Sequence, residues 1–169
     1  MFEPFAGSGP EPIGFLLVPE FSGLAFLSAV EPLRVANRLA GQSLFTWHAV
    51  SADGGPVTAS NGMAMMVESS VDTMRSVSAL IVCASFNPQK AETKSLFGSL
   101  RRLARKGVSL GSVDTGTHIL AAAGLLDHQR VTMHWEAVPA FREEFPLIDV
   151  SDELFEIGKG RFTCAGGTA

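Results

Sequence analysis

The chain is poor in cysteine and has no long apolar run. Its two cysteines, Cys83 and Cys164, cannot build the disulfide framework of a small secreted domain. Both lie in apolar, strand-like stretches, which favours a reduced setting. No apolar run reaches the roughly 18 residues that a membrane span needs. The sequence therefore predicts a cytoplasmic protein with no membrane partner.

Positive charge is also scarce. The 13 Lys and Arg residues are outnumbered by 17 Asp and Glu residues, which gives a formal net charge of -4. This balance argues against a segment that grips nucleic acid by itself. With 169 residues, 46% of them hydrophobic, the chain is long enough for one domain with a sizeable core. The Gly/Pro-rich residues 1–12 lack the basic and apolar regions of a signal peptide, so we expect a flexible tail there.

Several motifs that mark metal or nucleotide sites are missing. The sequence has no Cys-x-x-Cys, no His-x-x-x-His and no acidic loop of the calcium-binding type, so no metal site is expected. No Gly-x-Gly-x-x-Gly follows the first apolar stretch, and there is no Walker motif, which disfavours nucleotide binding. No cofactor is therefore expected.

The stretches that are present alternate between strand-like and helix-like patterns. Short apolar runs predict buried strands at residues 13–19, 45–51, 79–83 and 108–113. Helical spacing predicts helices over 24–39, 92–106, 119–123 and 134–145, with a kink or a restart at Pro32. A helical turn is expected at 71–77, a hairpin at 56–67, and short strands at 131–133, 147–150, 154–157 and 161–164. This alternation predicts an α/β fold with an open, mainly parallel sheet and helices on both faces.

Residues 107–124 organise this prediction, because they read as a buried strand, a sharp turn and a helix. Asp114, Thr115 and Gly116 have the chemistry of a turn and a helix N-terminus. One interpretation makes Asp114 an N-cap, worth about 1 kcal/mol. The other places it in a ligand crevice, since ligands of doubly wound sheets bind at the carboxyl ends of the strands.

Polar and aromatic residues follow three of the predicted strands, and these strand ends should converge in one crevice. A fourth group opens the helix at residue 134, where Trp135 is either an apolar wall of the crevice or a core side chain. The candidate ligand-binding residues are Glu20, Phe21, Ser22, Ala84, Ser85, Phe86, Asp114, Thr115, Gly116, His134 and Trp135.

Three other features are given structural interpretations. His118 follows the elbow at residue 114 and is expected to be packed rather than to act as a base. Cys83 ends an apolar strand with no histidine beside it in sequence, so a structural role is favoured over a nucleophilic one. The basic cluster at residues 101–106 is most simply a solvated helix face that suits the negative end of its helix.

Taken together, the motifs resemble a known family. The resemblance rests on Val-Asp-Thr-Gly-x-x-x-Leu-Ala-x-Ala-Gly-Leu-Leu-Asp, Val-Thr-x-His-Trp-Glu, Phe-x-x-x-Phe-Pro and Phe-Thr-Cys-Ala-Gly-Gly-Thr-Ala, with Gly-Phe-Leu-Leu-Val-Pro near the start. These residues look like the amidotransferase-like (ThiJ/PfpI-type) sensor domain of AraC-type transcription regulators. The resemblance covers residues 13–169. It implies a flavodoxin-like three-layer sandwich (class I glutamine amidotransferase-like), with one more helix and a helix-turn-helix DNA-binding domain expected beyond residue 169.

The resemblance also implies a role and a departure from it. Enzymes of the superfamily carry a cysteine at the elbow, usually followed by histidine, whereas this chain has Asp114 and Thr115 there. A sensor is therefore favoured over the alternative, a ThiJ/PfpI-superfamily hydrolase or glyoxalase-like enzyme. The family implies a small-molecule effector, a homodimer, and DNA contact only through the C-terminal module. A third alternative is a ligand-free module that only dimerises.

The elbow suggests what the effector would be. Backbone N–H groups near Thr115 and Gly116 would hold a carboxylate, and Asp114 would attract a cationic amine. Aromatic residues, namely Trp135, Phe21 and Phe86, would face that cation. Similar regulators include those of carnitine, glycine betaine and arginine use. The resemblance thus implies an amino-acid-like or quaternary-amine ligand.

Overall fold

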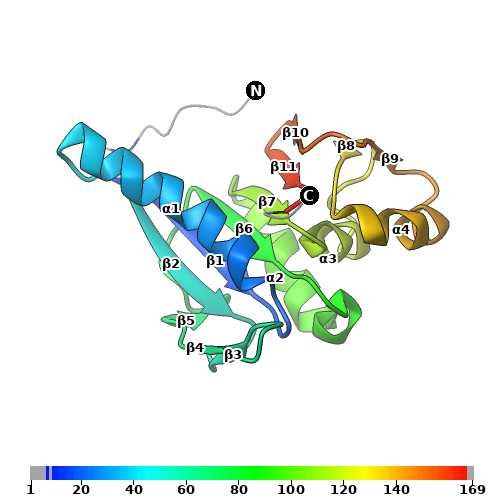
Figure 1. Cartoon of the computed structure of the whole chain (residues 1–169), viewed down its shortest axis with the longest axis horizontal. Helices are drawn as coiled ribbons and strands as arrows, with labels where there is room; N and C mark the ends of the chain where they lie inside the picture. The colour runs from blue at the N-terminus through cyan, green and yellow to red at the C-terminus, as the bar shows by residue number, and fades with distance from the viewer. Residues whose placement is uncertain (1–6, 8, 167–169) are drawn as a thin grey trace.

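A seven-stranded sheet forms the centre of the molecule in this computed structural model, which describes residue 7 and residues 9–166 (Figure 1). The strand order is β10-β11-β7-β6-β1-β2-β5. All neighbouring pairs are parallel except β10 and β11. The strands are β1 (Glu11–Leu17), β2 (Phe45–Ser51), β5 (Ser69–Ser70), β6 (Ala79–Cys83), β7 (Ser109–Val113), β10 (Phe155–Gly158) and β11 (Arg161–Cys164).

Helices and two small strand pairs surround the sheet. The helices are α1 (Gly23–Ala40), α2 (Lys94–Arg105), α3 (Gly116–Ala122) and α4 (Val138–Glu144), with 3-10 turns η1 (Pro88–Ala91) and η2 (Trp135–Ala137). The strand pairs are β3 (Val57–Thr58) with β4 (Ala64–Met65), and β8 (Arg130–Val131) with β9 (Asp149–Val150). Within residues 9–166, no helix is both long enough and apolar enough to cross a membrane.

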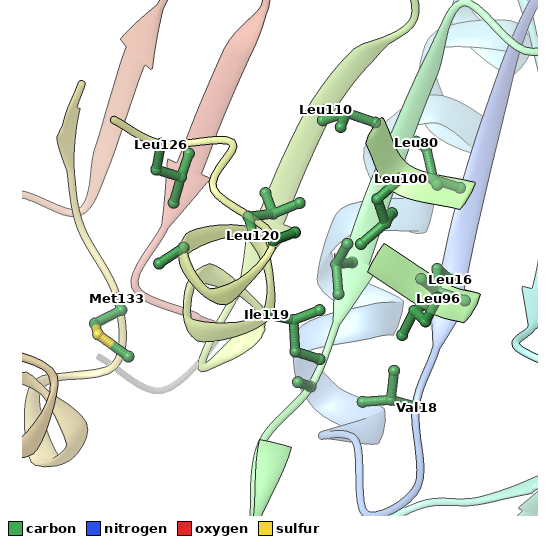
Figure 2. Close-up of a cluster of buried hydrophobic side chains, with 14 of the residues drawn as sticks. Leu16, Val18, Leu80, Leu96, Leu100, Leu110, Ile119, Leu120, Leu126 and Met133 are labelled. Atoms are coloured by element: carbon green, nitrogen blue, oxygen red, sulfur yellow. The ribbon is translucent and has the colours of Figure 1, made fainter. Parts of the chain in front are cut away.

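Two cores lie on the two faces of the sheet, which confirms the predicted three-layer α/β sandwich. Successive side chains of a strand point to opposite faces. In β1, Phe15 and Leu17 accordingly pack with α1, and Leu16 packs with α2 and α3. Figure 2 shows the second of these cores, in which Leu96 of α2 and Ile119 of α3 approach the strands. The apolar run of β1 is continuous because both of its faces are buried.

Some predicted boundaries differ from the structure. The expected restart at Pro32 is wrong, because α1 is one 18-residue helix across it; Pro32 lies on the exposed side. The predicted helical turn at 71–77 is also wrong. The segment instead forms a turn in which Thr73 N–H donates to Ser70, and it is anchored by the buried Val71 and Val77.

The two ends of the chain are only partly described. Strand β1 begins at Glu11, two residues before the predicted start, because Glu11 N–H donates to Leu44 O at 2.7 Å and pairs with Phe45. Of the expected flexible tail, residues 1–6 and 8 lie outside the described residues. So do residues 167–169, where we expected the chain to lead into a further helix.

Candidate ligand-binding site

The carboxyl ends of β1, β6 and β7 lie side by side. Leu17 is in register with Cys83, and Cys83 with Val113. The loops that follow are tied to each other. Phe21 forms a bridge with Ser85, and Thr115 Oγ1 donates to Ser85 O at 2.5 Å. The predicted convergence of the three strand ends is therefore present in the fold.

The same three loops contain non-glycine residues with left-handed backbone. Glu20 has a φ of 65°, Asn87 of 49° and Asp114 of 58°. Such values are uncommon outside glycine and cluster at functional sites. The Glu20 carboxylate accepts from Asn87 Nδ2 at 2.6 Å and from Lys90 Nζ at 3.2 Å. The Asn87 hydrogen bond, followed by the one from Lys90, lowers the pKa of Glu20. Glu20 therefore ties two of the three loops together.

A cavity of about 460 Å³ opens at this edge. Of the predicted residues, Ser22, Ser85, Phe86, Asp114, Thr115 and His134 line it. The sequence did not predict the other lining residues as ligand contacts; they are Ser60, Asn87, Pro88, Gln89, His118, Met133, Glu136, Ala137, Ala140 and Glu144. The cavity thus has two walls. One is built from the strand-end loops and the other from η2 and α4.

The remaining predicted residues do not line the cavity. Phe21 and Ala84 are buried in the core beneath it, and Glu20 pairs with Asn87 and Lys90. Trp135 is 64% exposed and stacks on His134 with 5.9 Å between ring centroids, outside the lining. The structure thus supports neither predicted role of Trp135, because its ring lies neither in the core nor in the cavity wall.

Gly116 has a packing role beside the elbow. A Cβ at this position would lie 2.3 Å from the Val82 carbonyl oxygen and 3.3 Å from Ser112 Cβ. Only glycine allows the first turn of α3 to approach β6 this closely. The turn chemistry of Asp114-Thr115-Gly116 therefore has two causes: close packing at Gly116 and left-handed backbone at Asp114.

Asp114 is buried at the elbow, with 6% of its surface exposed. The N-cap interpretation is wrong, because Thr115 occupies the N-cap position of α3 and no side chain caps the helix. Burial raises the pKa of the Asp114 carboxyl, and the charge of the nearby His134 offsets part of that rise. An ionised Asp114 would therefore gain from a cation placed in the cavity.

Charge in the cavity is predominantly negative. Its lining includes the carboxyl groups of Asp114, Glu136 and Glu144, and it includes no lysine or arginine. Lys90, the cation closest in sequence to the lining residues of this loop, is paired with Glu20. Phe86 adds an aromatic ring that is 60% exposed. Carboxylates with an exposed aromatic ring favour a cationic ligand over an anionic one.

His118 lies in the cavity wall between two carboxylates. Its Nδ1 is 2.7 Å from Glu92 Oε1, and its Nε2 is 2.9 Å from Glu144 Oε2. A neutral imidazole has only one N–H, so the imidazolium form is needed to donate to both. The ring is 4% exposed and packs edge-on against Phe141 and Phe145. Packing was predicted for His118, but its charged partners were not, since each lies 26 residues away in sequence.

Cys83 is shielded from solvent. It is fully buried at the end of β6, and burial raises the pKa of its thiol. A thiol in this state is a poor nucleophile, as the sequence indicated. Among residues 9–166, no group of three or more His, Cys, Asp or Glu side chains is arranged to hold a metal ion.

Fold and site together define a class: a doubly wound α/β domain with a ligand-sized cavity and an aspartate at the strand-to-helix elbow. The chain matches the DJ-1/PfpI family over residues 15–155, and it belongs to that family.

Within this family, the sequence relatives of the chain include several HTH-type transcriptional regulators. The chain is 53% identical over 155 residues to the HTH-type transcriptional regulator CdhR of Pseudomonas aeruginosa, covering 92% of this chain and 46% of CdhR. It is 43% identical to the regulator GbdR of the same species, covering 95% of this chain and 44% of GbdR. With the regulator GlxA of Rhizobium meliloti the identity is 40%, covering 93% and 49%. The chain thus spans about half the length of these relatives.

Solved structures agree with this placement. An AraC family transcriptional regulator from Pseudomonas putida superimposes with a TM-score of 0.82 and 27% identity, covering 94% of this chain and 85% of that chain. Drosophila melanogaster DJ-1beta shares the fold alone, with a TM-score of 0.78 at 15% identity, covering 94% and 83%. The relationship to AraC-type regulators therefore holds in both sequence and structure.

Proposed function

We propose that this chain is the effector-sensing and dimer-forming part of a bacterial AraC-type transcription regulator. Its cavity would bind a small metabolite with a cationic group, either amino-acid-like or a quaternary amine. Sequence relatives that match almost the whole chain are named HTH-type transcriptional regulators, and the chain covers about half of each. In this proposal, DNA is recognised by a separate module, and the domain described here reports on the metabolite.

The observation that carries the proposal is the excess of carboxyl groups over Lys and Arg in the cavity lining. Burial disfavours the ionised form of Asp114, and a cation in the cavity would add to the partial compensation from His134. Glu136 and Glu144 add two further carboxyl groups, of which Glu144 contacts His118, and the lining contains no lysine or arginine. The volume of about 460 Å³ lies at the smaller end of the range for ligand sites. Phe86 offers an aromatic face to an onium group.

The two walls of the cavity suggest how binding would be transmitted. One wall consists of strand-end loops, and the other comes from residues 133–144. A ligand that contacts both Asp114 and Glu144 would favour one arrangement of these walls over others. Such a population shift would then bias the dimer or the junction with the DNA-binding module.

Calorimetry tests the ligand class. We expect heat of binding from at least one of glycine betaine, carnitine and arginine, and at least about a tenfold weaker affinity for Asp114→Asn, because a charge-assisted contact is lost. Glu31→Gln is the matched control, since Glu31 pairs with Arg34 on the surface of α1 and should leave affinity unchanged. No heat from any of the three compounds, or equal affinity in Asp114→Asn, would contradict the proposed ligand.

Self-association is tested separately. Sedimentation velocity of the chain should show a dimer in the absence of effector, and a monomer at all concentrations would remove dimer formation from the proposal. The alternative of a ThiJ/PfpI-type enzyme has less support, because Cys83 is fully buried and Asp114 stands at the elbow. Turnover that is abolished by Cys83→Ser would revive it.

A further inference from the structure

A second cavity, with the opposite charge, lies at the amino edge of the sheet. Its volume is about 310 Å³, and it is built from residues 71–78, which lead into β6, and from residues 102–108, between the end of α2 and β7. The charged residues in its lining are Arg75, Arg102, Lys106 and Asp72. In contrast to the cavity at the carboxyl edge, cations dominate here.

Asp72, the acidic residue in this lining, does not neutralise its cations. Asp72 is already engaged by Arg102 Nη2 at 2.6 Å and by the hydroxyl of Ser99. Arg75 and Lys106 are exposed and make no ion pair with any residue in the described part of the chain.

Further cations continue the face along α2. Arg105 is exposed and also unpaired among residues 9–166, and Arg101 donates to the Ala123 carbonyl at 2.7 Å. One acidic residue, Glu11, contacts the cavity lining from outside, because its carboxylate accepts a hydrogen bond from Ser78 Oγ at 2.9 Å. We name the five cations on this side the basic face: Arg75, Arg101, Arg102, Arg105 and Lys106.

One feature indicates that the basic face suits an extended polyanion rather than a small buried anion. Arg75, Arg105 and Lys106 are solvent-exposed, so they do not form a desolvated pocket. Long, exposed cations spread over a helix face are the arrangement that neutralises successive phosphates of a nucleic acid backbone.

We propose that the basic face makes an accessory, sequence-independent contact with the phosphate backbone of duplex DNA. The chain as a whole carries a net charge of -4, so this contact is weak when the domain acts alone. The HTH-type relatives are about twice as long as this chain. A DNA-binding module on the same polypeptide would raise the local DNA concentration, which makes a weak second contact effective. This inference rests on the proposed role in a DNA-binding regulator but does not depend on the effector.

Salt-dependent binding of the chain to a short duplex of arbitrary sequence tests the contact. At low ionic strength, NMR shift changes should concentrate at residues 72–78 and 101–108. The variant Arg75→Gln/Arg105→Gln/Lys106→Gln should weaken binding and flatten the plot of log affinity against log salt by up to about 2.7, since each phosphate contact contributes about 0.9.

A matched triple variant separates local contact from general charge. Arg38→Gln/Lys94→Gln/Lys159→Gln removes three exposed cations that are unpaired within the described residues, and it changes the net charge from -4 to -7, as the first triple does. It should retain the wild-type salt slope.

Three results would overturn the proposal. The first is equal weakening in both triples, and the second is no duplex binding at low salt. The third is saturable binding of inorganic tripolyphosphate without duplex binding, which would assign the face to a small anion.

Discussion

The two edges of the sheet are built from the same strands but differ in charge and in backbone. The carboxyl edge carries the acidic cavity, with left-handed backbone at Glu20, Asn87 and Asp114. The amino edge carries the basic face, and shortly before two of its sheet strands the left-handed backbone falls on glycine, at Gly107 before β7 and at Gly160 before β11, while His128, ahead of β8, is a non-glycine exception. Glycine adopts this conformation without the steric cost that a side chain incurs.

This difference shows that the carboxyl edge keeps side chains at positions where they destabilise the fold. Glycine would relieve the backbone at all three loops of the carboxyl edge, but polar side chains occupy them, and one of these carboxyls is buried. Backbone strain and the burial of a carboxyl group are tolerated at functional sites, where ligand binding would offset their free-energy cost. The amino edge shows no such cost, because its cations are exposed. We therefore expect substitutions at the carboxyl edge to change folding stability strongly, and those at the amino edge to change it little.

The largest effect is expected at Gly116. Adding a methyl group in Gly116→Ala would bring Cβ to 2.3 Å from the Val82 carbonyl oxygen, a backbone atom that cannot move aside. We expect a loss of about 3 kcal/mol or more in the free energy of unfolding, measured by urea denaturation.

Gly98→Ala is the control for this substitution. Gly98 lies within α2, and a Cβ there would meet no atom within 4 Å. Alanine is the better helix former, so this variant should gain about 0.5–1 kcal/mol. Equal effects at the two positions would show that close packing does not distinguish the carboxyl edge.

The second effect is expected at His118. In His118→Leu the ring volume is largely kept, but Glu92 and Glu144 lose the imidazole that lies between them at 2.7 Å and 2.9 Å. Since Glu144 is half exposed, we expect a cost of about 2 kcal/mol, less than for a fully buried pair. Adding Glu92→Gln should recover part of this loss, because the unpaired charge is removed. A double-mutant cycle by urea denaturation at neutral pH measures this coupling. Additive effects would show that His118 and Glu92 are not energetically coupled.

Most of the sheet was predictable because each strand is specified locally. The apolar runs that became β1, β6 and β7 need only their own residues to be recognised, and their shared parallel direction brings the following loops together. The segment 71–77 was predicted wrongly since its apolar spacing fits a helix, whereas tertiary contacts bury Val71 and Val77 from a turn.

The wall formed by η2 and α4 was much less predictable. Glu136 and Glu144 have no local signal that separates them from a solvated helix face, and Trp135 looked like a better wall residue than either. Their position depends on how α4 packs against α3, which single-sequence periodicity does not encode. The basic face was partly predictable. Its cluster on α2 can be recognised in the sequence, but the position of Arg75 beside that cluster and the cavity between them can be seen only in the structure.

The third prediction compares the acids of the two edges. The pKa of Asp114 is raised, mainly by burial. Its contribution to stability is therefore complete below its ordinary pKa of 3.8 and is lost as the pH rises through the raised value. Asp114→Asn should become more stable than wild type as the pH rises above about 4, by on the order of 1 kcal/mol near neutrality.

Asp72, at the amino edge, should show the opposite slope. The hydrogen bond from Ser99, followed by that from Arg102, lowers the pKa of Asp72. Its contribution is present above its ordinary pKa of 3.8 and is lost as the pH falls through the lowered value. Melting temperatures of wild type, Asp114→Asn and Asp72→Asn between pH 3 and about pH 7 test both signs. Parallel slopes for the two variants would contradict the contrast between the edges.

The smallest effect is expected from Arg102→Gln. Arg102 and Asp72 form a close pair, 2.6 Å apart, but their side chains are 42% and 45% exposed. Exposed pairs contribute between zero and about 1 kcal/mol, and salt screens them further. We therefore expect a loss below about 1 kcal/mol in the free energy of unfolding, which disappears at high salt. A larger, salt-independent loss would mean that the amino edge, like the carboxyl edge, depends on buried electrostatics for its fold. A small loss would leave its cations free to serve a partner outside the domain.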